Sequence, residues 1–467
     1  MYIYENALKE NKNFVIWGCG RYLRGVVDKI SPDINITHII DSDKHKWGRI
    51  TATYSGKELK CQSPDILPGL KNTVVMVAVQ STELYKSIKN DIRKIWDGEV
   101  IHINEAVKSY LPEYEKKQIA LYDNAMGSVD EPGDMDKIIC YADISVPVET
   151  CNLQCQYCYV GQNNDLYERE VVYHSPQFVR RAFSRKRIGG TAFINLCGMG
   201  ETLLCKELPG IIRELLYEGH YIEIVTNTLI SKSIKQILDF NMNDRIIFKC
   251  SFHYAELKRR NLLEKYVENI QMIKDHGASL TIELVPHDEL IPYIDEIKSF
   301  SMENFGALPH VSVSRDETKK NIPLFSKLSE EEFENTWGVF DSSMFDYKMK
   351  TLKKQTEYCI AGRGSFIMNL DNGEAVFCCK NDRFTNIYKN IDKPIEYQEI
   401  GYRCKSPWCI NAHAYLTLGM IDKVNDYTYL EMRDRMCTDG SHWIQERMAG
   451  MMRQRICDNL KSHKDLL

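Results

Sequence analysis

Short apolar runs separated by amphipathic stretches predict an α/β architecture for the first hundred residues. Residues 84–95 have the apolar spacing of an amphipathic helix. A shorter helical segment around Gly25 follows the apolar run at residues 14–17. Strands that alternate with helices are typical of a parallel sheet. The runs that predict strands are residues 14–17, 36–40, 73–79 and 100–103.

The turn after the first predicted strand reads Gly18-Cys19-Gly20, and Asp41 follows the second strand. Such a turn can present backbone N–H groups to an anion, and an acidic residue about 20 positions later can meet a ribose hydroxyl in a dinucleotide fold. The pattern is incomplete, because Leu23 stands where glycine usually allows close packing of helix on strand. Two interpretations remain open: a nucleotide site, or a degenerate Rossmann-like scaffold for docking or assembly.

A second series of apolar runs begins near residue 139 and predicts repeated β/α units. Functional side chains of such units gather at the carboxyl ends of the strands, as in a (β/α) barrel. The series therefore predicts a partial (β/α)6 barrel, with one unit more than the apolar runs and with its site at that end. The runs are residues 141–148, 188–196, 221–225, 246–251 and 280–285.

A cysteine-bearing hairpin and a helical tail follow the predicted barrel. Asp371-Asn372-Gly373 is a strong hairpin signal. Trp443 and the nearby methionines Met448, Met451 and Met452 are expected to pack in a core. The predicted domains are a Rossmann-like domain at 1–110, a linker at 111–138 with a charged turn at 130–134, a partial barrel at 139–345, and a hairpin-plus-helix domain at 346–467.

Composition and charge exclude several classes of protein. The 467 residues carry a formal net charge of -5, which argues against general nucleic-acid binding. No run of eighteen apolar residues predicts a membrane span, and the polar first twelve residues lack the core of a signal peptide. Sixteen cysteines without a secretory signal predict metal or redox ligands in a cytoplasmic protein.

Three of these cysteines, Cys151, Cys155 and Cys158, form a C-x3-C-x2-C motif. Three thiolates can hold three irons of a [4Fe-4S] cluster and leave the fourth iron open, as a catalytic metal site keeps an open position. A zinc knuckle or three unrelated thiols is the alternative. The motif resembles the signature of the radical S-adenosylmethionine (SAM) superfamily. That resemblance implies that SAM binds the open iron and is cleaved to a 5′-deoxyadenosyl radical.

The segment Cys197-Gly198-Met199-Gly200-Glu201 resembles the family's G-G-E-P stretch, with Met199 and Thr202 as departures. Glu201 is expected to accept a hydrogen bond from the SAM ammonium, and the glycines to allow close approach of the backbone. Thr226-Asn227-Thr228 resembles the family's T-N-G turn. The resemblance further implies SAM contacts from Tyr157, Asn227, Ser251 and Glu283, with His287 as an alternative to Glu283.

A second group of cysteines resembles the start of the SPASM or twitch extensions of radical SAM enzymes. Cys359 and Cys378 flank Gly373 in a C-x13-G-x4-C spacing, and Cys404 and Cys409 can complete four ligands. One auxiliary [4Fe-4S] cluster is therefore expected, with a structural four-cysteine zinc site as the alternative. Cys379 and Cys250 are left without a role, the latter because alternation turns it away from Ser251.

The motifs imply hydrogen abstraction by a radical SAM enzyme but say little about the substrate. The first hypothesis is oxidation or epimerisation of a sugar or another small or carrier-linked substrate, with flavodoxin or ferredoxin as electron donor. The second is maturation of a ribosomally made peptide. The third is a non-catalytic iron–sulfur or zinc scaffold that binds a partner through the Rossmann-like domain.

Overall fold

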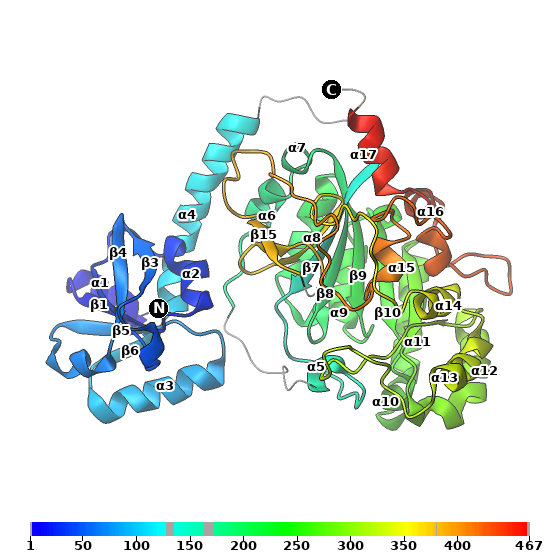
Figure 1. Cartoon of the computed structure of the whole chain (residues 1–467), viewed down its shortest axis with the longest axis horizontal. Helices are drawn as coiled ribbons and strands as arrows, with labels where there is room; N and C mark the ends of the chain where they lie inside the picture. The colour runs from blue at the N-terminus through cyan, green and yellow to red at the C-terminus, as the bar shows by residue number, and fades with distance from the viewer. Residues whose placement is uncertain (1, 128–134, 163–170, 380, 465–467) are drawn as a thin grey trace. The chain divides into compact units, whose positions relative to one another are not determined.

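The computed structural model describes residues 2–127, 135–162, 171–379 and 381–464, and the chain forms two compact units (Figure 1). The first comprises Met1–Leu121 and Tyr167–Phe178, and the second comprises Tyr122–Leu166 and Val179–Leu467. The charged turn expected at 130–134 lies outside the described residues.

The first unit contains a six-stranded sheet in the order β3-β4-β2-β1-β5-β6. The four predicted strands are present and parallel to one another: β1 (Asn13–Trp17), β2 (Ile36–Ile40), β5 (Thr73–Val77) and β6 (Glu99–His102). The sequence analysis missed the antiparallel pair β3 (Ile50–Tyr54) and β4 (Lys57–Gln62) at one edge. Their side chains are mostly exposed and polar, so no apolar run marks them.

Helices cover both faces of this sheet, as a parallel sheet requires. The helices are α1 (Tyr2–Lys9), α2 (Arg21–Val26), α3 (Thr82–Ile95) and α4 (Ile103–Met126). Alternate residues of β1 enter two separate cores: Phe14 and Ile16 pack with α1 and α2, and Val15 and Trp17 pack with α3. The near-continuous apolar runs seen in the sequence follow from this two-sided burial.

The second unit contains a nine-stranded sheet in the order β12-β11-β10-β9-β8-β7-β13-β14-β15. The six strands from β7 to β12 are parallel, as expected for a partial barrel. They are β7 (Ile138–Val146), β8 (Thr191–Gly198), β9 (Tyr221–Thr226), β10 (Ile246–Ser251), β11 (Ser279–Leu284) and β12 (His310–Val311). Connecting helices include α8 (Leu208–Tyr217), α9 (Ser231–Leu238), α11 (Leu263–Asp275) and α12 (Ile294–Phe305).

The predicted cysteine-bearing hairpin extends this same sheet. Strand β13 (Ser365–Asn369) pairs in parallel with β7, and β14 (Glu374–Val376) folds back on β13 and pairs with β15 (Arg383–Asn386). Gly373 has a φ of 74° in the turn, which is the conformation that the hairpin signal predicts. The hairpin therefore lies beside the first barrel strand.

Part of the C-terminal segment packs against residues near the starts of the barrel strands, among them Ile138, Tyr221 and Ile247. Its helices are α14 (Ser343–Lys350), α15 (Ala412–Tyr415), α16 (Glu446–Met452) and α17 (Ile456–Lys464). The predicted packing methionines Met448, Met451 and Met452 are buried against the barrel side chains Tyr141 and Phe193. They form core, as expected.

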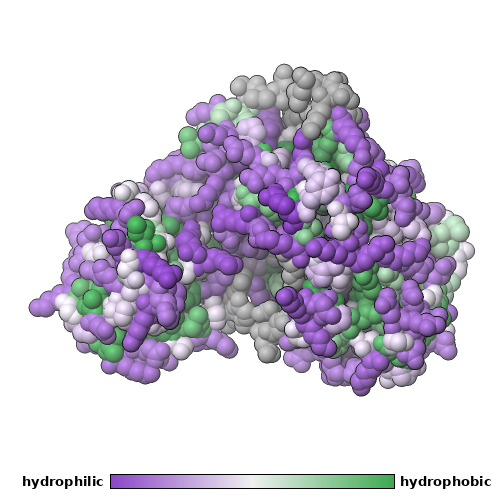
Figure 2. All heavy atoms as spheres, viewed as in Figure 1, coloured by the Kyte–Doolittle hydropathy of each residue, from purple (hydrophilic) through white to green (hydrophobic). Residues whose placement is uncertain are grey.

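Polar residues cover most of the face that Figure 2 shows, with apolar residues scattered between them. Among the described helices, none combines the length and the apolar character that crossing a membrane would need.

Candidate functional site

A cavity of about 410 Å³ opens at the carboxyl ends of the barrel strands. Residues at or just after the ends of six different strands line it, as expected where the ends of parallel strands meet. The predicted site residues among its lining are Cys151, Cys155, Tyr157, Cys158, Gly198, Gly200, Glu201, Asn227 and Ser251.

The three cysteines of the C-x3-C-x2-C motif reach the cavity from the loop after β7. Cys151 is exposed, and Cys155 and Cys158 are partly exposed. The Leu153 N–H lies 3.4 Å from the Cys151 sulfur. Burial raises the pKa of the Cys155 thiol to about 12 and also raises the pKa of Cys151. A bound cation would therefore be needed to keep these thiols ionised, as a metal does.

The spacing of the sulfurs helps to distinguish a cluster from zinc. Four thiolates at a Zn–S distance of about 2.3 Å in a tetrahedron lie about 3.8 Å apart. Among the described residues, no three cysteine sulfurs lie within 4.8 Å of one another, in this loop or in the second cysteine group. The described cysteine sulfurs are therefore not gathered as closely as the four ligands of a zinc site.

Gly200 fits tightly against the start of the cysteine loop. A Cβ on Gly200 would lie 1.9 Å from the Thr150 carbonyl oxygen, and a Cβ on Gly198 would lie 3.2 Å from the Thr202 Cα. The Glu201 N–H donates to Thr150 O at 2.9 Å. The segment after β8 thus pairs with the backbone next to Cys151, so packing within the chain itself requires the glycine at 200.

Glu201 is buried and organises the turn after β9. Its carboxylate accepts hydrogen bonds from Thr226 Oγ1 at 2.6 Å, Asn227 N at 2.7 Å and Leu203 N at 3.0 Å. Burial raises its pKa, although these three donors favour the ionised form. A carboxylate has about four acceptor positions, so one remains for a ligand donor.

The turn after β9 takes the conformation that its glycine-containing counterpart would take. Thr228, which stands where the family has glycine, has a φ of 63°. Asn227 donates through Nδ2 to Asn152 Oδ1 at 2.7 Å, which ties the turn to the cysteine loop. Thr228 therefore holds a left-handed backbone conformation that favours glycine, and this costs some strain.

Tyr157 lies among histidines on one side of the cavity. Its ring centroid is 3.9 Å from that of His287, and its hydroxyl is 2.5 Å from His253 Nδ1. Ser251 lines the cavity from the end of β10, and Cys250 on the same strand does not, in agreement with strand alternation.

Glu283 and its alternative His287 are not among the residues that line the cavity, whereas the other expected SAM contacts are. It is buried in an ion pair with Arg433 and lies 3.3 Å from Lys249 Nζ. Arg433 also lies 3.4 Å from Glu223, and its Nε donates a hydrogen bond to the Tyr429 hydroxyl at 2.8 Å. The expected ligand contact of Glu283 is thus replaced by a charge network, because an arginine 150 residues later occupies the barrel interior beside it.

Cavity residues that the sequence analysis missed follow β12. Ser312, Ser314 and Arg315 line the cavity, and the Arg315 guanidinium lies 5.5 Å from the centre of the Tyr159 ring. Strand β12 has only two residues, so it leaves no apolar run in the sequence. Counting β/α units and expecting a sixth strand after α12 is the signal that could have found these residues.

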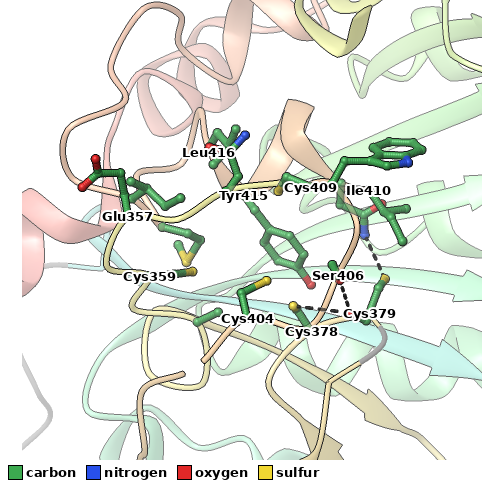
Figure 3. A pocket seen from close by; sticks show the side chains of 16 residues that line it. Glu357, Cys359, Cys378, Cys379, Cys404, Ser406, Cys409, Ile410, Tyr415 and Leu416 are labelled. Carbon is green, nitrogen blue, oxygen red and sulfur yellow. Dashed lines mark hydrogen bonds between the residues drawn. The ribbon is translucent and has the colours of Figure 1, made fainter. Parts of the chain in front are cut away.

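A second pocket gathers the C-terminal cysteines (Figure 3). Cys359 precedes β13 and Cys378 follows β14, so the hairpin brings them together as predicted, and a bridge between Cys359 and Gly401 brings the next segment alongside. Burial raises the pKa of Cys359 to about 11 and raises the pKa of Cys378 and Cys409. The cysteines lining the pocket are Cys359, Cys378, Cys379, Cys404 and Cys409.

Cys379 is a fifth thiol in this pocket, which the sequence analysis left without a role. The Asn411 amide lies 3.9 Å from its sulfur and 3.4 Å from Asp143 Oδ2 in the barrel. Asp143 also accepts a hydrogen bond from Asn195 at 2.8 Å, and burial raises its pKa to about 6. Asn411 thus connects the cysteine pocket with the polar interior of the barrel.

In the first unit, the Asp41 carboxylate occupies the N–H groups that a bound nucleotide would need. Asp41 Oδ2 accepts from the Cys19 N–H at 2.8 Å and lies 2.9 Å from Lys46 Nζ, and Oδ1 accepts from Asp43 N. A Cβ on Gly18 would lie 2.9 Å from Ala78 O, so close strand packing requires this glycine. These contacts favour the scaffold interpretation of the Gly18–Gly20 turn.

No family model matches the chain. Solved structures similar to it include Streptococcus suis SuiB bound to S-adenosylmethionine, at 14% identity over 67% of this chain and 76% of that chain, with a TM-score of 0.39. Native anSMEcpe with bound AdoMet matches at 14% identity over 53% and 78%, with a TM-score of 0.38. BtrN in complex with AdoMet and 2-DOIA matches at 16% identity over 59% and 94%, with a TM-score of 0.32.

All three proteins hold S-adenosylmethionine in those structures. Because each TM-score lies below 0.5, the function proposed below rests on the residues of this chain.

Proposed function

We propose that this protein is a radical SAM enzyme that abstracts hydrogen from a small or carrier-linked substrate, with a sugar as the favoured class. The observation that carries the proposal is the meeting of three motifs at one cavity: the cysteine loop after β7, the Gly198–Glu201 segment after β8 and the Thr226–Asn227 turn after β9. These segments are distant in the sequence, and their meeting is not a consequence of the motifs alone.

In this proposal Cys151, Cys155 and Cys158 hold a [4Fe-4S] cluster whose fourth iron takes SAM. When bound, the cluster supplies one electron for cleavage of SAM to a 5′-deoxyadenosyl radical, which removes hydrogen from the substrate. The position of all three cysteines at the lining of one cavity supports this ligand set.

The chain's own side chains would orient SAM. The open acceptor position of Glu201 would receive the SAM ammonium, while Thr226 and the Asn227 N–H hold that carboxylate in place. Tyr157 would contact adenine with its ring, and Ser251 would meet the ribose. Gly200 would keep the Glu201 segment against the cysteine loop.

Cys359, Cys378, Cys404 and Cys409 would hold one auxiliary [4Fe-4S] cluster, with Cys379 beside it. A closed cluster there would supply an electron acceptor and so favour net oxidation of the substrate over epimerisation. We also propose a flavodoxin or ferredoxin as electron donor and a cytoplasmic location, which the absence of disulfides among the described cysteines supports.

The domain division at 1–110, 111–138, 139–345 and 346–467 also stays a proposal.

The fold of the first unit favours a small substrate over a peptide. A small winged-helix module would grip a leader peptide, whereas this unit contains a largely parallel sheet covered by helices on both faces. A non-catalytic scaffold would not need the free acceptor position of a buried Glu201 at the cysteine cavity.

Reductive cleavage of SAM tests the proposal. Anaerobically reconstituted protein, reduced with dithionite, is expected to form 5′-deoxyadenosine and methionine, and the Cys155→Ala variant is expected to form neither. Cys250→Ala is the matched control, because this buried thiol lies outside the cavity. Absence of 5′-deoxyadenosine from the unsubstituted protein, with clusters loaded, would support the scaffold hypothesis instead.

A further inference from the structure

Lys348, on α14, is a buried cation without an acidic partner. The residue is 5% exposed, and its ammonium donates one hydrogen bond, to Ser312 Oγ at 2.8 Å. In the part of the chain that the structure describes, no carboxylate lies within ion-pair distance of this ammonium. A buried charge is costly unless it is paired. An ammonium has three N–H donors, and within the described ranges only one of them has a partner, Ser312.

Two further cations approach the same place from other elements. Arg315 lines the cavity three residues after Ser312. Lys249 precedes the cavity-lining Ser251 by two positions on β10, so it faces the same side of the strand. Burial lowers the pKa of Lys348 well below its usual range, and the charges of Arg315 and Lys249 lower it further.

The carboxylates near these cations are already shared. Lys249 lies 3.3 Å from Glu283, but Glu283 also pairs with the buried Arg433. Arg315 lies 3.1 Å from Glu317. None of these acids pairs with Lys348. Among the described residues, no carboxylate therefore pairs with Lys348 beside Ser312.

We propose that Lys348, Lys249 and Arg315 bind an oxyanion of the substrate, a carboxylate or a phosphate, beside Ser312. This inference rests on the proposed function, because it assigns a substrate class to the same cavity. An ammonium is a compact charge that suits either anion, and a guanidinium can hold either with two hydrogen bonds. A substrate bound in this way would be anionic, as a sugar phosphate or a sugar acid is.

The position of Arg315 connects this anion site with the cysteine loop. Its guanidinium lies 5.5 Å from the ring of Tyr159, the residue that follows Cys158. A substrate anchored by its anion at Ser312 would thus extend toward the part of the cavity where the proposed radical forms. The carboxylate of SAM is a second source of the same chemistry, and the experiment separates the two.

The test is thermal unfolding of the reconstituted holoprotein with inorganic phosphate or acetate, against chloride at equal ionic strength, with and without saturating SAM. An anion that binds the folded state raises the unfolding midpoint. We expect millimolar phosphate or acetate to raise the midpoint by about 2 °C or more, with SAM present as well as without it. The anion that gives the larger shift identifies the substrate group.

Lys348→Met is expected to lose this shift, and Lys350→Met is the matched control, because Lys350 is exposed on the same helix. No shift in the unsubstituted protein, or an equal shift in Lys348→Met, would overturn the proposal. A shift that disappears when SAM is bound would assign the site to SAM and overturn the substrate assignment. If Lys348→Met does not fold, Lys249→Met at the same site is expected to weaken the shift, and an unchanged shift there would count against the proposal.

The experiment distinguishes a failure of the anion site from a failure of the proposed function. If phosphate raises the unfolding midpoint but the protein does not cleave SAM, the radical SAM proposal is overturned and the anion site remains supported. SAM cleavage without any anion shift would remove only the anion site.

Discussion

The Cα of Gly200 and the carbonyl oxygen of Thr150 lie so close that a Cβ on Gly200 would be 1.9 Å from that oxygen. Real Cβ atoms do not approach backbone oxygens this closely, so any larger residue must push the Glu201 segment away from the cysteine loop. The contact is a link between the two motifs that the proposed SAM site depends on.

Gly200→Ala is therefore expected to separate Glu201 from the cysteine loop. We predict at least a tenfold rise in the KM for SAM together with a loss of stability of about 1–3 kcal/mol, which is typical of overpacking. Gly198→Ala is the matched control, because its Cβ would lie 3.2 Å from the Thr202 Cα and needs only a small shift. Equal effects of the two variants on the KM would contradict this account of the contact.

Glu283→Gln separates a structural role of this carboxylate from a role in SAM binding. Because Glu283 pairs with the buried Arg433, we expect a loss of about 3–5 kcal/mol in the free energy of unfolding. The KM for SAM is expected to change less than twofold. Chemical denaturation and SAM-cleavage kinetics measure the two effects, and a large rise in KM with unchanged stability would restore the SAM contact expected from the sequence.

The two adjacent thiols of the second pocket are expected to differ in the auxiliary cluster. Cys378→Ser should reduce the iron content by about four atoms per chain, because it removes one of four proposed ligands. Cys379→Ser should leave the iron content unchanged. The opposite result would make Cys379 the ligand and place Cys378 beside the cluster.

Asp143 should give the protein a characteristic pH dependence. Burial raises its pKa from 3.8 to about 6, so the folded state holds a proton on Asp143 that the unfolded state releases between these values. The stability that Asp143 contributes is therefore present below pH 4 and is lost as pH rises through 6. The difference in unfolding free energy between the unsubstituted protein and Asp143→Asn should fall over that range, and a constant difference from pH 4 to 7 would show that this pKa is not raised.

The sequence predicted the strands whose two faces are both buried. β2 and β10 match their predicted bounds because the core buries three of the five positions of β2 and four of the six positions of β10. β3 and β4 were missed because an exposed edge pair keeps polar side chains, although the Ser55-Gly56 turn between them, with positive φ at both residues, is a hairpin signal. β12 was missed because two residues leave no pattern.

The site was predictable where one motif carries the chemistry and unpredictable where distant residues meet. Cys151, Glu201 and Asn227 line the cavity because each follows a strand whose end could be read from the sequence. Arg433 lies 150 residues from Glu283 in the sequence, so no local sequence pattern could predict their ion pair. The partner of Lys348 is Ser312, 36 residues earlier, and hydrophobic periodicity does not predict this pairing either.

The most direct test of the central claim is the iron and labile sulfide content of anaerobically reconstituted protein, with and without alanines at Cys151, Cys155 and Cys158. The account predicts about eight irons per chain, falling to about four in the triple variant. About four irons that disappear entirely with the triad would leave the C-terminal cysteines without a cluster. An iron content that the triple variant leaves unchanged would contradict the claim that these three cysteines hold the SAM-binding cluster.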